Sequence, residues 1–149
     1  MTSATEVCVD ASLAVKVVVT EPDSDKADSL FKEWADDGKE LIAPAFFEVE
    51  TDSILRQKVA VRRELNAEQA EVAFYKLQAL PIQQISVSGQ RKRAWEIAAE
   101  FGASTVYDAT YLALAELRGC EFWTADQRLF NQVKDKLSFV KYLGTYAPR

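Results

Sequence analysis

Three aspartates, Asp10, Asp108 and Asp126, stand where expected strands end or expected helices begin. In a parallel sheet the carboxyl ends of the strands share one edge, so Asp10 and Asp126 meet there if their strands are neighbours. Asp108 reaches that edge only if its helix begins there. Carboxylate oxygens are hard ligands for Mg²⁺ or Mn²⁺, and such ions activate water for cleavage of phosphodiesters. The pattern therefore indicates a candidate metal site.

A fourth acid is expected from the helical pattern at residues 46–61, which carries Glu48, Glu50 and Asp52. On a helix Glu48 and Asp52 lie on one face, whereas Glu50 points about 160° away from each of them. Periodicity does not choose among the three.

Helix capping is the competing role for the same aspartates. Aspartate is a common N-cap, and Thr105 with Asp108 has the spacing of a capping box. A cluster of carboxylates without a cation, however, costs several kcal/mol in repulsion or raises their pKa values. Both roles remain open from spacing alone.

Histidine is absent from the 149 residues, which excludes a Ser-His-Asp triad and a Cys-His pair. Hydrolytic chemistry would have to use carboxylates, lysine, tyrosine or a metal. The two cysteines, Cys8 and Cys120, belong to no CxxC motif and are expected to be buried thiols.

The net charge of −5 disfavours a large nucleic-acid interface but permits a small site whose charge is neutralised by metal ions. The length suits a single domain, residues 1–149. The N-terminal residues do not resemble a signal peptide and no apolar run could span a bilayer, so we expect a cytoplasmic protein.

Strand patterns alternate with helical patterns along the chain, which predicts parallel βαβ units and an α/β fold with helices on both faces of the sheet. The expected strands are residues 5–10, 40–43, 82–87, 121–125 and 138–142. The expected helices are residues 11–20, 22–37, 46–61, 67–80, 89–101, 105–118 and 127–134.

At these residues the sequence resembles the PIN-domain family, specifically the VapC-type toxins of bacterial toxin–antitoxin pairs. The resemblance rests on four blocks in the family's order: residues 9–12 (VDAS), 44–55 (PAFFEVETDSIL), 107–115 (YDATYLALA) and 122–129 (FWTADQRL). It implies a three-layer α/β/α sandwich with a central parallel sheet of about five strands in the order 3-2-1-4-5. That order places the first and fourth strands side by side.

The resemblance also implies the metal ligands. Asp10 and Asp108 would bind the metal directly, and Asp126 would complete the site through water or a second ion. Glu50 matches the acid of the second block because Leu55 follows at the family's distance. Glu48 is the alternative if the register differs.

Three hydroxyl side chains match supporting positions of the family. Ser12 and Thr124 would orient the ligands through hydrogen bonds. Ser53 stands where the family often has asparagine, so support of the second-block acid could differ here.

The activity that the resemblance implies is hydrolysis of RNA by water activated on Mg²⁺ or Mn²⁺. Its implied partners are the RNA substrate, a cognate antitoxin protein that blocks the acidic groove, and a second copy in a homodimer. Two basic runs could contact RNA phosphates, although solvated helix faces are the alternative. They are Arg56, Lys58, Arg62 and Arg63, and then Arg91, Lys92 and Arg93.

Two other functions remain open. A non-catalytic PIN-like domain would serve binding or regulation and show little cleavage. An aspartate-based phosphotransfer module also uses an Asp after a first strand. The aspartate-nucleophile phosphatases of that class want D-x-D there, whereas Asp10 is followed by Ala11 and Ser12.

Overall fold

A five-stranded parallel sheet in the order β3-β2-β1-β4-β5 forms the centre of the computed structural model, which describes residues 5–149. The strands are β1 (Glu6–Val9), β2 (Glu40–Ala43), β3 (Ile82–Gln84), β4 (Glu121–Thr124) and β5 (Val140–Tyr142). Each neighbouring pair is parallel. The predicted fold class and strand order are therefore confirmed.

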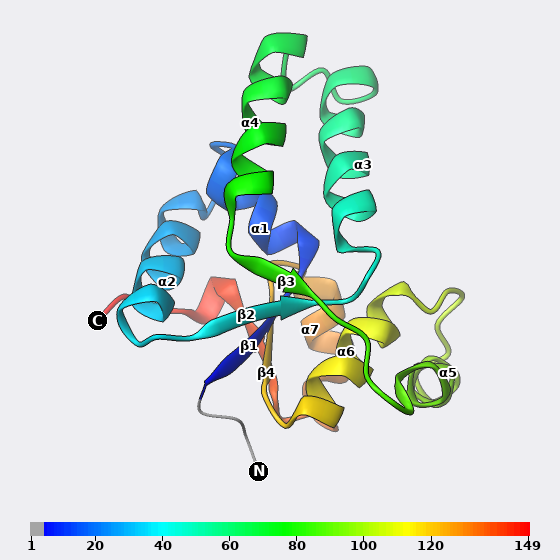
Figure 1. Ribbon diagram of the computed structural model, residues 1–149. Coiled ribbons are helices and arrows are strands. Elements are labelled where there is room, and N and C mark those ends of the chain that lie inside the picture. The colour runs from blue at the N-terminus through cyan, green and yellow to red at the C-terminus, as the bar shows by residue number, and fades with distance from the viewer. Residues whose placement is uncertain (1–4) are drawn as a thin grey trace.

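Helices cover both faces of this sheet (Figure 1). They are α1 (Ala11–Val18), α2 (Ser24–Asp36), α3 (Phe47–Ala60), α4 (Ala67–Ala79), α5 (Gln90–Glu100), α6 (Tyr107–Arg118) and α7 (Gln127–Val133), with a 3₁₀ turn at Leu143–Thr145. α1 packs against α2, α3 and α4, whereas α6 packs against α5, β1 and β4 on the other face. The α3–α4 pair rises away from the sheet as two antiparallel helices (Figure 1).

The central strand and α6 form the most buried part of the core. Every residue of β1 is buried, and so is the run Tyr111–Ala115 of α6. Continuous burial is expected for a central parallel strand covered on both faces. Cys8 and Cys120 lie in this core as free thiols, as predicted.

Strand register brings the carboxyl ends of β1 and β4 together. Val9 lies opposite Trp123, and the backbone N–H of Asp10 donates to the carbonyl of Trp123 at 3.1 Å. The residues that follow the two strands therefore share one edge of the sheet.

Four helices, α2, α3, α5 and α6, begin one or two residues later than predicted. α2 begins at Ser24, α3 at Phe47 and α5 at Gln90. The cap of α5 is Gly89, with a left-handed φ of 82° that glycine adopts without strain. α6 begins at Tyr107 after Val106, two residues later than expected. Within residues 5–149, no helix is both long and apolar enough to cross a bilayer.

Candidate active site

Asp10 is a buried carboxylate held in place by two hydroxyl groups. It caps α1, and its oxygens accept from Ser12 Oγ at 3.1 Å and from Thr124 Oγ1 at 2.5 Å. Burial raises the pKa of Asp10 above its ordinary value, the hydrogen bonds partly offset this rise, and the charge of Asp126 adds to it. Ser12 and Thr124 thus occupy the positions that orient this acid.

Asp126 lies just past β4 and caps α7. Its Oδ1 accepts from the backbone N–H of Leu129 at 3.1 Å, and its own backbone N–H donates to Thr124 Oγ1 at 2.9 Å. The fully buried Thr124 hydroxyl therefore joins the two strand-end aspartates.

Asp108 stands in the first turn of α6, exposed at the rim of the same edge. Because Val106 is the cap residue and no side chain caps this helix, the predicted capping box of Thr105 and Asp108 does not form. The pKa of Asp108 is raised to about 6. Partial burial of the carboxyl is the largest cause, and the charges of Asp10 and Asp126 add to it. Capping therefore accounts for Asp10 and Asp126 but not for Asp108.

Glu50, rather than Glu48, faces the aspartates from α3. Its Oε1 is buried, without a hydrogen-bond partner in the described part of the chain. Desolvation is the largest cause that raises the pKa of Glu50 to about 7, and the charges of Asp10 and Asp108 add to it. Glu48 is exposed and its charge acts on Asp52 instead.

The four carboxylates Asp10, Glu50, Asp108 and Asp126 are here called the acidic cluster. The charges of Asp10 and Asp108 act on Glu50, and the charge of Asp126 acts on Asp10 and Asp108. Within residues 5–149, no three Asp, Glu, Cys or His side chains are arranged to hold a metal ion as they stand. Ser53 lies apart from the cluster: it is exposed, and within the same residues it makes no hydrogen bond to Glu50.

Tyr111 is a site residue that the sequence reasoning missed. It is fully buried, and its hydroxyl has no hydrogen-bond partner among the described residues. Burial, and then the charges of Asp10 and Glu50, raise the pKa of Tyr111. Tyr111 follows Asp108 by one helical turn, so both project from one face of α6. That spacing, in an otherwise apolar helix, was the signal available in the sequence.

The first basic run does not act as one surface. Lys58 is only 4% exposed, and its Nζ donates to Glu21 at 2.6 Å and to Glu64 at 3.0 Å. Lys58 is therefore a buried ion-pair residue, and its prediction as an RNA contact is corrected. Arg56, Arg62 and Arg63 remain exposed.

Comparison with known proteins gives one family and several relatives. The family model described as "PIN domain" matches residues 7–136, which include all four blocks. The ribonuclease VapC12 of Mycobacterium tuberculosis is 30% identical over 123 residues, which cover 83% of this chain and 88% of that protein. The ribonuclease VapC9 of the same species is 38% identical over 89 residues, 60% of this chain and 67% of that protein.

Proposed function

Because the chain belongs to the PIN-domain family, we propose that it is a metal-dependent endoribonuclease, the toxin of a VapBC-type toxin–antitoxin pair. The names of its mycobacterial relatives support ribonuclease activity. The observation that carries the proposal is the convergence of four carboxylates from the ends of β1 and β4 and from α3 and α6. Like charges brought together in this way are relieved by a cation.

The donor set fits Mg²⁺ or Mn²⁺ by its chemistry. All four side chains offer hard oxygen ligands, and Glu50 Oε1 is a buried acceptor left without a partner among the described residues. Asp10, Glu50, Asp108 and Asp126 would hold the ion through these oxygens. When bound, the ion would supply hydroxide from water near neutral pH and neutralise phosphate charge.

The chain's own residues have separate tasks in this mechanism. Ser12 and Thr124 fix the orientation of Asp10 through their hydroxyl hydrogen bonds. Asp108 and Asp126, both exposed, lie where an RNA phosphate can approach from solvent. Glu50 completes the donor set from α3, and Tyr111 lies behind it as a buried hydroxyl. Histidine is not needed, which agrees with its absence.

Cleavage of end-labelled RNA in Mn²⁺ or Mg²⁺, and in EDTA, tests the proposal. Asp10→Asn and Asp108→Asn should each lower the cleavage rate by about a hundredfold or more. Losing a residue that only supports a metal ligand already costs about 10- to 100-fold, and losing the ligand itself should cost at least as much. Asp135→Asn is the matched control because Asp135 is an exposed aspartate beyond α7. Cleavage that persists in EDTA, or undiminished rates in both variants, would overturn the proposal.

A non-catalytic PIN-like domain is the second candidate, and the absence of a preformed coordination shell among residues 5–149 favours it. It predicts that Mn²⁺ neither raises the melting temperature nor permits RNA cleavage. The same assay therefore separates the two candidates.

Two protein partners belong to the proposal. A cognate antitoxin would cover the acidic cluster with an arginine or lysine side chain, which pairs strongly with carboxylates. We expect a small antitoxin reading frame beside this gene; co-expression of its product should abolish cleavage, and Asp126→Asn should weaken the complex. The chain should also form a homodimer, measurable by sedimentation velocity.

A further inference from the structure

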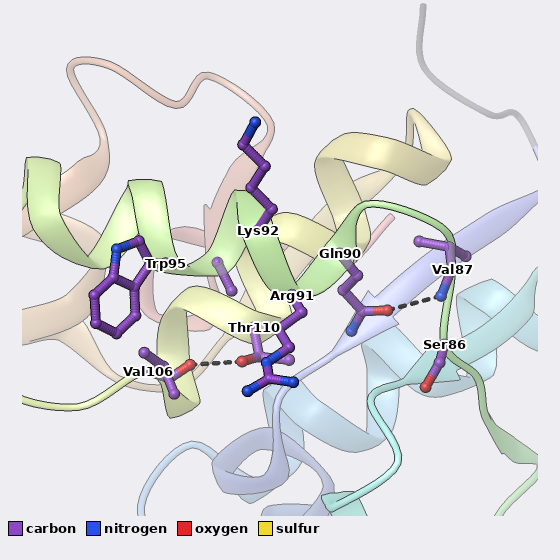
Figure 2. Close-up of a pocket in the computed structure, with 9 residues that line it drawn as sticks. Ser86, Val87, Gln90, Arg91, Lys92, Trp95, Val106 and Thr110 are labelled. Atoms are coloured by element: carbon purple, nitrogen blue, oxygen red, sulfur yellow. Dashed lines mark hydrogen bonds between the residues drawn. The ribbon is translucent and has the colours of Figure 1, made fainter.

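A groove between α5 and α6 lies beside the acidic cluster and takes no part in the arrangement described so far. It encloses about 850 Å³, and its lining includes Arg91, Lys92 and Trp95 of α5 and Val106 and Thr110 beside Asp108 (Figure 2). The lining comes from the turn after β3, from α5 and from the start of α6.

Arg91 and Trp95 give this groove its chemistry. They are one helical turn apart and point to the same side of α5, and Lys92 of the same helix also lines the groove (Figure 2). Trp95 is 72% exposed, an unusual position for so large an apolar side chain. Arg91 forms no ion pair within residues 5–149, whereas Arg93 is held by Glu116 at 2.5 Å.

The groove begins on the same helical turn as Asp108, one member of the acidic cluster. Val106 and Thr110 line it, and Asp108 lies between them on α6. Asp108 and Thr110 are about 3 Å apart along the helix axis, on nearly opposite faces. Tyr107, which is 57% exposed, lies at the end of the helix between these faces. A chain held at Asp108 can therefore continue over the first turn of α6 into the groove.

We propose that this groove binds the single-stranded RNA next to the scissile phosphate, with a base stacked on Trp95 and a phosphate bound by Arg91. The inference rests on the proposed function and names the form of its substrate. Stacking on exposed aromatic rings and contact of arginine with phosphates are the means by which proteins bind single strands. Arg91 and Lys92, the two cations of the lining, form no ion pair within residues 5–149, so the groove complements a polyanion.

Fluorescence anisotropy of a labelled single-stranded RNA, measured in EDTA, tests binding without requiring cleavage. Trp95→Ala and Arg91→Ala should each weaken binding by about tenfold, the size expected for loss of one stack or one phosphate contact. Trp95→Phe should recover part of the affinity. Arg91→Ala should also lower the slope of log K against log salt by about 0.7.

Lys76→Ala is the matched control, since it removes the same charge from an exposed side chain on α4, outside the residues that line the groove. It should change affinity far less than Arg91→Ala. Equal effects of the two variants would mean that only net charge matters, and would overturn the groove assignment.

Two further measurements separate the failure of this inference from failure of the proposed function. Bis(p-nitrophenyl) phosphate is too small a substrate to reach the groove. Its turnover in Mn²⁺ should therefore stay unchanged in the Trp95 and Arg91 variants. If wild type cleaves RNA and these variants keep its KM, the groove inference fails alone. If Trp95→Ala instead halves the mass in sedimentation, a second copy of the chain occupies the groove and the inference is also overturned.

Discussion

Thr124 links the carboxylate of Asp10 to the backbone of Asp126 through one buried hydroxyl, which donates to Asp10 and accepts from the backbone N–H of Asp126. Thr124→Val keeps the shape but removes both hydrogen bonds. The hydrogen bond from Thr124 lowers the pKa of Asp10, so its loss should raise that pKa further. We expect RNA cleavage to fall about 10- to 100-fold.

Thr124→Ser is the control for this prediction because it retains the hydroxyl. The rate of cleavage and the melting temperature should be measured together on both variants. A Thr124→Val protein that is stable and fully active would contradict the role assigned to the hydroxyl.

Glu50 makes the stability of the metal-free protein depend on pH. Its folded pKa is raised from 4.5 to about 7, so the folded state binds a proton that the unfolded state has released in this range. The free energy of unfolding therefore decreases as pH rises from about 4.5 to about 7. Thermal melts in EDTA at pH 5 and pH 8 should show a smaller decrease for Glu50→Gln than for wild type.

Glu48→Gln is the matched control, because Glu48 is an exposed acid on the same helix. Its melting temperature should follow wild type at both pH values. An equal response of the two glutamine variants would place the titrating group elsewhere.

At the scale of the element, local chemistry predicted some helices well and others poorly. Asn66 and Gln69 form a reciprocal capping box, and α4 begins at the residue that this signal predicts. The start of α6 could not be predicted in this way, because Val106 supplies no capping side chain. Its position is set by packing against α5, β1 and β4.

The buried face of α3 does not follow its apolar residues. Val49 and Val61 are 67% and 75% exposed, whereas the buried residues are Phe47, Thr51, Leu55 and Lys58. Because Lys58 and Thr51 are buried, the hydrophobic residues of α3 do not recur at helical spacing. The contacts with α1 and α4, rather than hydrophobicity alone, determine which face of α3 is buried.

Lys58 is expected to stabilise the end of α3. It joins α3 to Glu21, in the turn after α1, and to Glu64, in the turn before α4. Lys58→Ala should lower the free energy of unfolding by about 2 kcal/mol, less than for a fully enclosed pair, because both carboxylates reach solvent. Urea denaturation measures this loss.

Arg56→Ala provides the comparison on the same helix, since Arg56 is exposed and should change stability by less than about 0.5 kcal/mol. Similar losses for the two variants would show that the ion pairs at Lys58 contribute little.

At the scale of the whole molecule, the alternation of strands and helices predicted the fold class but not which strands are neighbours. The strand order 3-2-1-4-5, now observed, followed from resemblance to the family rather than from the residues. The prediction that Asp10 and Asp126 lie close together depended on that order, because it makes β1 and β4 neighbours. Tyr111 and the α5–α6 groove depend on tertiary contacts between distant segments, which periodicity does not report.

Metal binding should be visible in the stability of the whole chain. A ligand that binds only the folded state at a hundred times its Kd stabilises it by about 2.7 kcal/mol. Mn²⁺ should therefore raise the melting temperature of wild type, and Asp10→Asn should abolish the rise. An unchanged wild-type melting temperature at millimolar Mn²⁺ would argue against a bound ion.

The projecting α3–α4 pair has a consequence for motion. Its contacts with the rest of the molecule concentrate on α1, and the outward residues Val72 and Tyr75 are exposed. Such a pair can detach as a local unfolding unit while the sheet persists, so its amide hydrogens should exchange earlier than those of β1. Each such excursion would carry Glu50 away from the three aspartates, which all remain on the sheet side. The acidic cluster would then contain Glu50 only while α3 is packed on α1. Firmer packing of α3 would keep the four acids together for a larger share of the time.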